Sequence, residues 1–208
     1  MENNKSRRLV GMNTNKAMLC VLLILFCVGE LTGVFLWCNT HIELPDSLYI
    51  ISGRFFDSRA QSTFIQTVIN SFSGGFILLF MCMLLGMGAV FQPIAAAVLF
   101  FRGLGIGVTL AEINSVYGMK GFGLSLIMII PYTAASAVII AVGARESIFM
   151  STDIFKRISG ADRNMKAPDI RLYFTKYIIL TAVLAAASLL DSLITFFFAG
   201  LWTRLQEF

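Results

Sequence analysis

Charged side chains are scarce in this chain, and the scarcity decides its class. Of the 208 residues, 13% are charged and 57% are hydrophobic, with a mean hydropathy of +0.80. Soluble domains average about 25% charged and about 45–50% apolar residues. One soluble core of this size has no room for such an excess of apolar side chains, so we expect most of them to face lipid. The composition therefore predicts an integral membrane protein.

Residues for metal, redox or catalytic chemistry are also few. The single histidine, His41, excludes every metal site that needs two histidines. The cysteines form no Cys-x-x-Cys pair; they are Cys20, Cys27, Cys38 and Cys82. The sequence contains no His-Glu-x-x-His, Gly-x-Ser-x-Gly or Walker A pattern. We therefore expect no metal, no cofactor and no catalytic residue, and predict that the protein is not an enzyme.

Long apolar runs are what the chain does contain. A helix needs about 20 apolar residues to cross the hydrocarbon of a bilayer, and lipid offers the backbone no other hydrogen-bond partners. The first run is too long for a cleaved signal peptide, so we expect an uncleaved anchor. The sequence predicts an all-α, polytopic bundle of about five transmembrane helices, at about 17–37, 72–91, 94–111, 122–143 and 177–200.

The links between these runs carry their own signals. Apolar residues at helical spacing over 64–72 predict an interfacial helix that bends into the second span at Gly74 and Gly75. Residues 112–121 are expected to form a short link. Residues 144–176 are expected to form a polar segment outside the bilayer, in which Asp169 caps the last helix.

Lysine and arginine counts predict the orientation. Eleven of them lie in the tail 1–16 and the segment 144–176, against four in the opposite links. Because cytoplasmic links carry the excess of positive charge, we place the tail, the N-terminus and 144–176 in the cytoplasm. Aspartates alternate with the basic residues of 144–176, which favours contact with a membrane surface or a protein partner over nucleic acid.

Three charged residues lie inside apolar runs: Glu30, Arg102 and Asp191. A lone charge at mid-bilayer costs about 2.5–3.5 kcal/mol on insertion scales, so each should have a partner. We expect Arg102 to pair with one acid or with both. We favour a role in fixing helix register, and the alternative is an ion path or a buried ligand contact.

Small residues predict where helices approach one another. Gly29 with Gly33, and Gly103 with Gly107, form Gly-x-x-x-Gly patterns that allow close helix packing. On the last run, small, polar and apolar residues at spacings of three and four predict a stripe that faces protein; they are Thr181, Leu184, Ser188, Asp191 and Thr195. Pro131 is expected to kink the fourth span.

One stretch of the sequence resembles a known family. The segments Phe101–Thr109 and Tyr117–Phe122, followed by Ile129-Ile130-Pro131, are similar to the stage II sporulation protein M family. The resemblance covers roughly residues 62–145, and the remainder matches by topology. Where many members have a glycine and an acid at the start of the fourth span, this chain has Ile130-Pro131-Tyr132.

The resemblance implies a non-catalytic membrane protein of endospore formation. Family members work with membrane-anchored, peptidoglycan-degrading proteins during engulfment, so we expect a scaffold or anchor in the cell membrane, enriched in septal or engulfing membrane. Its surfaces for those partners would be residues 38–71 and 112–121, and the oligomeric state stays open. Some relatives resemble small permeases, and the alternative is a transporter subunit whose route is lined by the three intramembrane charges.

Overall fold

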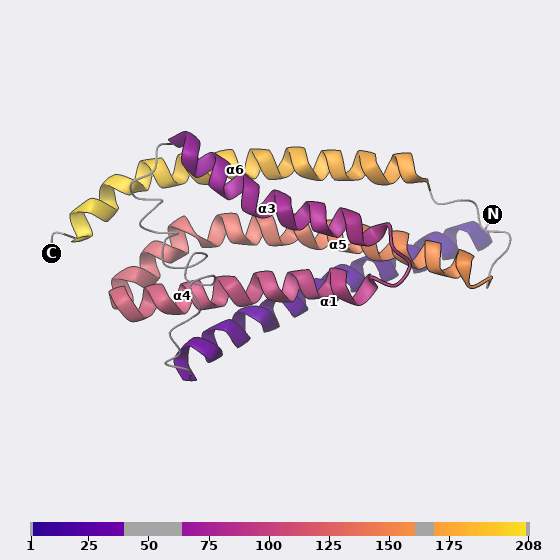
Figure 1. Ribbon diagram of the computed structural model, residues 1–208, viewed down its shortest axis with the longest axis horizontal. Coiled ribbons are helices and arrows are strands. Elements are labelled where there is room, and N and C mark those ends of the chain that lie inside the picture. Colours follow the sequence, from indigo (N-terminus) through magenta and orange to yellow (C-terminus); the bar gives the residue numbers. More distant parts are fainter. Residues whose placement is uncertain (1, 40–63, 161–168, 207–208) are drawn as a thin grey trace.

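The computed structural model describes residues 2–39, 64–160 and 169–206, and these residues are almost entirely helical. In this part of the chain the helices are α1 (Glu2–Asn39), α3 (Phe64–Gly86), α4 (Gln92–Met128), α5 (Ile130–Ile158) and α6 (Ile170–Gln206) (Figure 1). All five contain a stretch long and apolar enough to cross a membrane. The predicted helical bundle is confirmed, and the chain is a multi-pass membrane protein.

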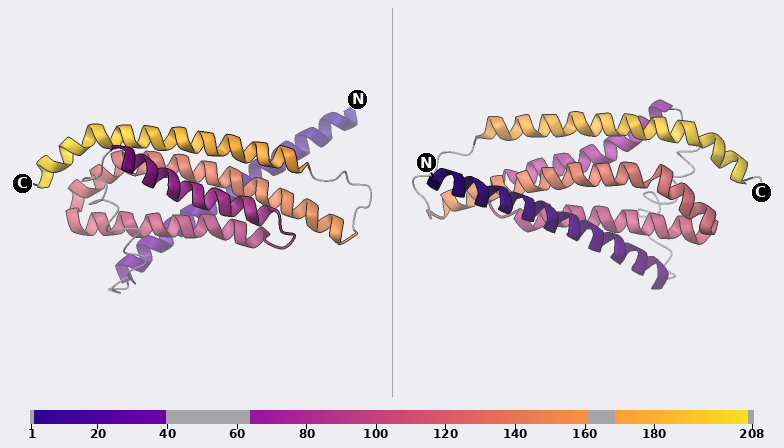
Figure 2. Two further views of the ribbon diagram at one scale, coloured as in Figure 1. Left: turned by 45° about the horizontal axis from the view of Figure 1, so that its top comes forward. Right: turned by 180° about the vertical axis from the view of Figure 1, so that it is seen from behind.

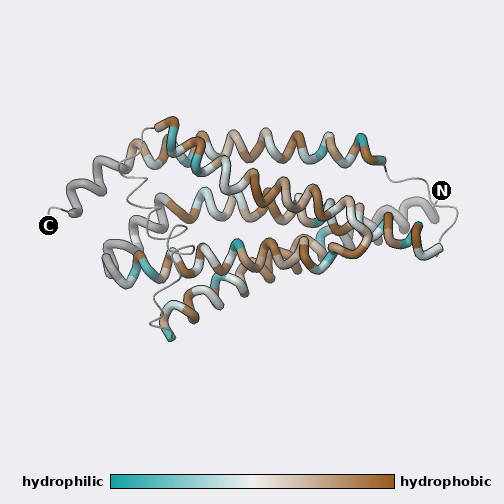
Figure 3. The backbone as a smooth tube through the Cα atoms, viewed as in Figure 1, coloured by the Kyte–Doolittle hydropathy of each residue, from teal (hydrophilic) through white to brown (hydrophobic). Residues whose placement is uncertain are grey.

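The helices run along one long axis. α3, α5 and α6 pack together, α4 packs on α5, and α1 crosses α4 obliquely. Figure 2 shows the same crossing of α1 from behind. Hydrophobic residues occupy most of the middle of the bundle, and hydrophilic ones gather toward the helix ends (Figure 3). The start of α1, the end of α5 and the start of α6 lie at one end, so the described parts of both basic segments share that end, which we call the N-terminal end. Its cytoplasmic location stays a prediction.

The helix bounds differ from those of the apolar runs. α3 is continuous from Phe64 to Gly86, so the expected interfacial helix with a bend at Gly74 and Gly75 is wrong. Likewise, α5 and α6 extend far into the expected polar segment 144–176. The physical reason is that α3 and α5 turn polar side chains inward. A buried serine or threonine lowers the hydropathy of a run without ending the helix.

The turn between α4 and α5 also differs from expectation. Gly118, where φ is 58° and ψ is −143°, divides α4 into two helical segments, so the expected short link 112–121 is reduced to a kink at this glycine. That backbone conformation is essentially restricted to glycine. Pro131 lies in the first turn of α5, where its missing amide removes no helical hydrogen bond. The predicted span 122–143 is helical on both sides of Ile129, so the effect of the proline is a helix break directly before it, at the start of α5.

The cap and the inward face of α6 follow the sequence prediction. Its start is capped by Asp169, whose carboxylate accepts a hydrogen bond from the amide of Leu172 at 3.2 Å, as expected. The predicted stripe faces the bundle: Leu184, Ser188 and Asp191 are buried, as is Thr195. This face positions the polar groups described below.

α1 and α4 cross in direct backbone contact. A Cβ atom on Gly29 would clash with the carbonyl oxygen of Phe100, and one on Gly33 with that of Leu104. The contact is reciprocal: a Cβ on Gly103 or Gly107 would clash with carbonyl oxygens of α1, at Phe26 and Glu30. The two Gly-x-x-x-Gly patterns thus meet each other, which lets the helices approach more closely than side chains allow.

Candidate functional site

Asp191 of α6 is a carboxylate inside the bundle, and it is 3% exposed. Its Oδ2 accepts a hydrogen bond of 2.8 Å from the hydroxyl of Ser71 on α3. The hydroxyl of Tyr132, on α5, donates in turn to the backbone carbonyl of Ser71. Side chains from three helices therefore meet at one level of the bundle.

Two threonines flank this level. α3 and α6 run antiparallel (Figure 1). One helical turn beyond Ser71, toward the start of α3, lies Thr67, and one turn beyond Asp191, toward the end of α6, lies Thr195. Each threonine is 3% exposed. The Oγ1 atom of Thr195 is buried and has no hydrogen-bond partner. We call these five residues the Asp191 cluster: Thr67, Ser71, Tyr132, Asp191 and Thr195.

The other two intramembrane charges are on other helices of the bundle. Glu30 is on α1, with its backbone against Gly103 and Gly107 of α4. Arg102 is half-buried on the face of α4 that carries the buried residues Leu99 and Ile106. α1 packs chiefly on α4 and has no extended contact with α6 in the described residues. The structure thus assigns Glu30 and Asp191 to separate helix pairs, and the pairing of Arg102 with an acid stays a prediction.

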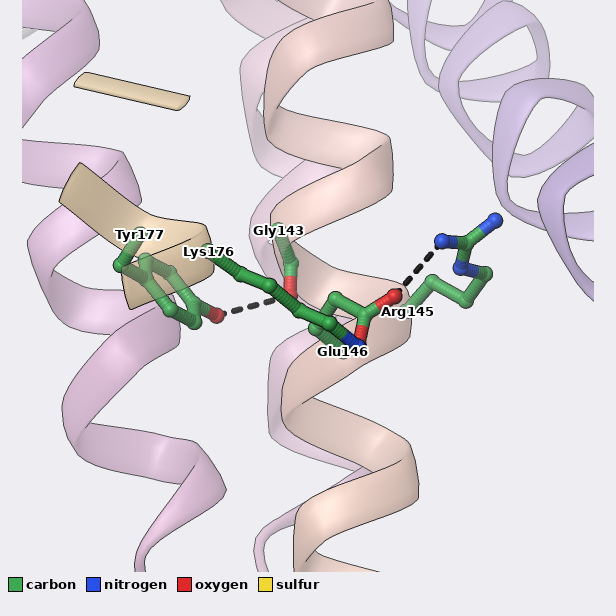
Figure 4. Close-up of polar contacts among 5 residues, drawn as sticks. All are labelled: Gly143, Arg145, Glu146, Lys176 and Tyr177. Carbon is green, nitrogen blue, oxygen red and sulfur yellow. Dashed lines mark hydrogen bonds and ion pairs between the residues drawn. The ribbon is translucent and has the colours of Figure 1, made fainter. Parts of the chain in front are cut away.

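A second polar group lies toward the N-terminal end, around Glu146 of α5. Its Oε1 pairs with Arg145 at 2.6 Å, and its Oε2 pairs with Lys176 of α6 at 2.6 Å (Figure 4). The side chain of Glu146 is 13% exposed and that of Lys176 is 44% exposed. The ion pair with Lys176 therefore ties α5 to α6 at the border between buried and open surface.

Beside this ion pair, hydrogen bonds from hydroxyl groups connect α3, α5 and α6. Tyr177 donates to the carbonyl of Gly143 at 2.7 Å, as Figure 4 shows, and Tyr173 donates to that of Met83 at 2.8 Å. Ser147 donates to the carbonyl of Cys82 at 2.6 Å. Each bond runs between different helices, so each one fixes the position of one helix against another. We call Ser147, Tyr173 and Tyr177 the hydroxyl ties.

A cleft of about 260 Å³ opens beside Glu146. Its lining combines apolar side chains such as Met150 and Leu172 with the carboxylates of Glu146, Asp153 and Asp169. Both oxygens of Glu146 are already engaged in ion pairs, and Asp169 caps α6. Two of the three carboxylates therefore already have structural roles: Glu146 ties α5 to α6, and Asp169 caps the start of α6.

The hydroxyl ties and the Glu146 ion pairs were missed by sequence reasoning, which assigned 144–176 to a polar link. A signal for them does exist. Gly143, Ser147 and Ser151 recur every four residues, as do Tyr173 and Tyr177, which is the spacing of one helical face. Read as a continuation of the fourth and fifth spans, this spacing indicates a buried face.

Comparison with known proteins does not assign this chain to a family. No family model, no curated protein and no solved structure matches this chain.

Proposed function

We propose that this protein is a non-catalytic membrane scaffold. The observation that carries the proposal is where the buried polar groups direct their hydrogen bonds. Ser147, Tyr173 and Tyr177 each donate to a backbone carbonyl of a neighbouring helix. Such bonds hold helices at fixed positions, which suits a protein that presents a stable surface to partners.

The resemblance to the stage II sporulation protein M family supports a more specific role. On that resemblance, the scaffold anchors peptidoglycan-remodelling proteins at the cell membrane during engulfment. Its partner surface is the bundle end opposite the N-terminal end. There the described residues of α4 include the exposed Asn114 and Ser115, close to the turn at Gly118. The expected partner surface 38–71 falls largely on 40–63, which lies outside the described residues.

Affinity capture tests this role. We expect the tagged, detergent-solubilised protein from sporulating cells to co-purify with peptidoglycan hydrolases. The variant Ser115→Arg places a long charged side chain on the proposed partner surface and is expected to reduce recovery of the hydrolases about tenfold, a loss of about 1.4 kcal/mol in binding. The matched control Lys156→Glu changes an exposed residue at the N-terminal end and should leave recovery unchanged. Normal engulfment after deletion of the gene would count against the proposal.

A transporter subunit is the second candidate, and one observation favours it. Asp191 is a carboxylate buried within a membrane span, and such residues commonly mark ion or substrate paths. On this reading the Asp191 cluster is part of the route. Ion flux into liposomes that carry the purified protein, with loss of that flux in Asp191→Asn, would favour the transporter over the scaffold.

A further inference from the structure

We propose that two copies of this protein form a parallel dimer in the membrane through the outward face of α3. The proposal goes beyond the scaffold role and does not depend on it, because a monomer can present the same partner surface. It rests on a polar side chain, Asn70, which the bundle leaves exposed within a membrane-spanning helix. The spacing and chemistry of the residues around Asn70 indicate a second copy of the chain as the partner.

Asn70 lies at a depth where lipid surrounds the helix. α3 is 23 residues long, or about 34 Å, and Asn70 lies about 9 Å along its axis from Phe64. A hydrocarbon layer of about 30 Å centred on α3 therefore includes this residue. α3 packs on α5 and α6 with its other side (Figure 1), and Asn70 is exposed. Because hydrocarbon cannot form hydrogen bonds, an amide at this position needs a partner from outside the bundle.

The side chains that share this face recur along α3 at alternating spacings of three and four residues. Ile77, Phe80 and Leu84 are exposed, and Ser73 is half-buried. This is the a/d pattern of helices that pack as left-handed pairs, with Asn70 at an a position. A single asparagine at such a position fixes the register and the number of helices. We call these five residues the α3 seam: Asn70, Ser73, Ile77, Phe80 and Leu84.

The α3 seam is complementary to itself. Two copies of a membrane protein have the same orientation in the bilayer, so their α3 helices are parallel and equal residues face each other across a twofold axis. Asn70 then meets Asn70 of the second copy. An asparagine amide is both a donor and an acceptor of hydrogen bonds, so two of them satisfy each other.

Short groups beside Asn70 allow the two helices to approach. Gly74 is exposed, and a Cβ atom at this position would meet no other atom within 4 Å. The hydroxyl of Ser73 donates to the backbone carbonyl of Asn70 at 3.2 Å, so it needs no further partner in the interface. Close contact of the two backbones is therefore possible next to the paired amides.

Energy transfer between labelled copies in liposomes tests the proposal. Full-length protein that carries a donor or an acceptor dye is reconstituted at decreasing ratios of protein to lipid, which yields the Kd of the dimer. We expect the native protein to dimerise reversibly. Asn70→Leu removes the amide and is expected to raise the Kd about tenfold, equivalent to about 1.4 kcal/mol of binding.

The matched control is Asn39→Leu, the same substitution at an exposed position of α1. The amide of Asn39 donates to the carbonyl of Phe35 in its own helix at 3.3 Å, so the Kd should be unchanged. An equal Kd for the native protein and Asn70→Leu would overturn the proposal, since any dimer would then form through another surface.

A disulfide across the α3 seam provides a second readout, which does not require Asn70→Leu to fold. With the native cysteines replaced by alanine, Ile77→Cys should form covalent dimers when native membranes are oxidised, because the two copies of this position face each other. Val183→Cys, at an exposed position of α6 outside the seam, should stay monomeric. Energy transfer no greater than random collision predicts at every dilution, together with the absence of an Ile77→Cys dimer, would contradict the proposal.

Discussion

Replacing Gly107 by leucine is expected to separate α1 from α4 and to lower the free energy of unfolding by about 3 kcal/mol. The Cβ of any larger residue at this position clashes with the carbonyl oxygen of Glu30. That atom belongs to the backbone of α1, so the whole helix must shift, and the reciprocal contacts at Gly29 and Gly33 are lost with it. Thermal or dodecyl sulfate unfolding of the purified protein measures the loss.

Gly105→Leu is the matched control for this prediction. It adds the same side chain two residues away on the same helix, where a Cβ has no neighbour within 4 Å. Both substitutions replace glycine by a better helix former, a change worth about 0.8–1.0 kcal/mol in favour of the variant. The control should therefore be at least as stable as the native protein. Equal stability of the two variants would show that α1 and α4 do not pack in the way described.

Removing the three hydroxyl ties together is expected to lower the free energy of unfolding by about 2–3 kcal/mol. The variant combines Ser147→Ala, Tyr173→Phe and Tyr177→Phe, and it deletes three hydrogen bonds between helices with little change in packing. Hydrogen bonds between helices in membranes contribute about 0.6 kcal/mol on average and up to about 1.7 kcal/mol. The same unfolding assay measures the change.

A second triple variant separates bonds between helices from bonds within one. Thr152, Thr175 and Thr181 each donate to a carbonyl four residues earlier in their own helix. Replacing all three by valine removes as many hydroxyls but no tie between helices, so we expect a loss of less than about 1 kcal/mol. If both triple variants are destabilised equally, the hydroxyl ties have no special role in holding the bundle together.

Much of the fold follows from the sequence because lipid cannot form hydrogen bonds with the backbone. Apolar runs of about 20 residues leave helix as the available structure, so the number of spans is readable from composition. The inward face of α6 is readable as well, since Ser188, Asp191 and Thr195 recur at helical spacing and are all buried. These features depend on local sequence, and they were predicted correctly.

Helix ends and the partners of buried groups depend on more distant parts of the chain. The apolar run of the second span seemed to begin near residue 72 because Thr67 and Ser71 lower the hydropathy, yet both face neighbouring helices. The partner of Ser71 is Asp191, which is 120 residues away in sequence. The site was half predicted as a result: Asp191 was identified as intramembrane and inward-facing, but its contact with Ser71 and Tyr132 required the packing of three helices.

The central claim is that the inward polar side chains hold helices together and do not line a water-filled route. Ser136 of α5 is 0% exposed and Ser188 of α6 is 1% exposed, so each can be replaced by cysteine as a probe of the interior. Cys38 is exposed at the far end of α1 and serves as the positive control once the other native cysteines are replaced by alanine.

The decisive measurement is the reaction of these cysteines with a membrane-impermeant thiol reagent, applied in turn to either side of sealed native membranes. We predict that Cys38 reacts from the outer face, and that Ser136→Cys and Ser188→Cys stay unmodified from both faces until the protein is unfolded. Modification of position 136 or 188 in the folded protein, from either face, would contradict the scaffold and reveal an aqueous path through the bundle.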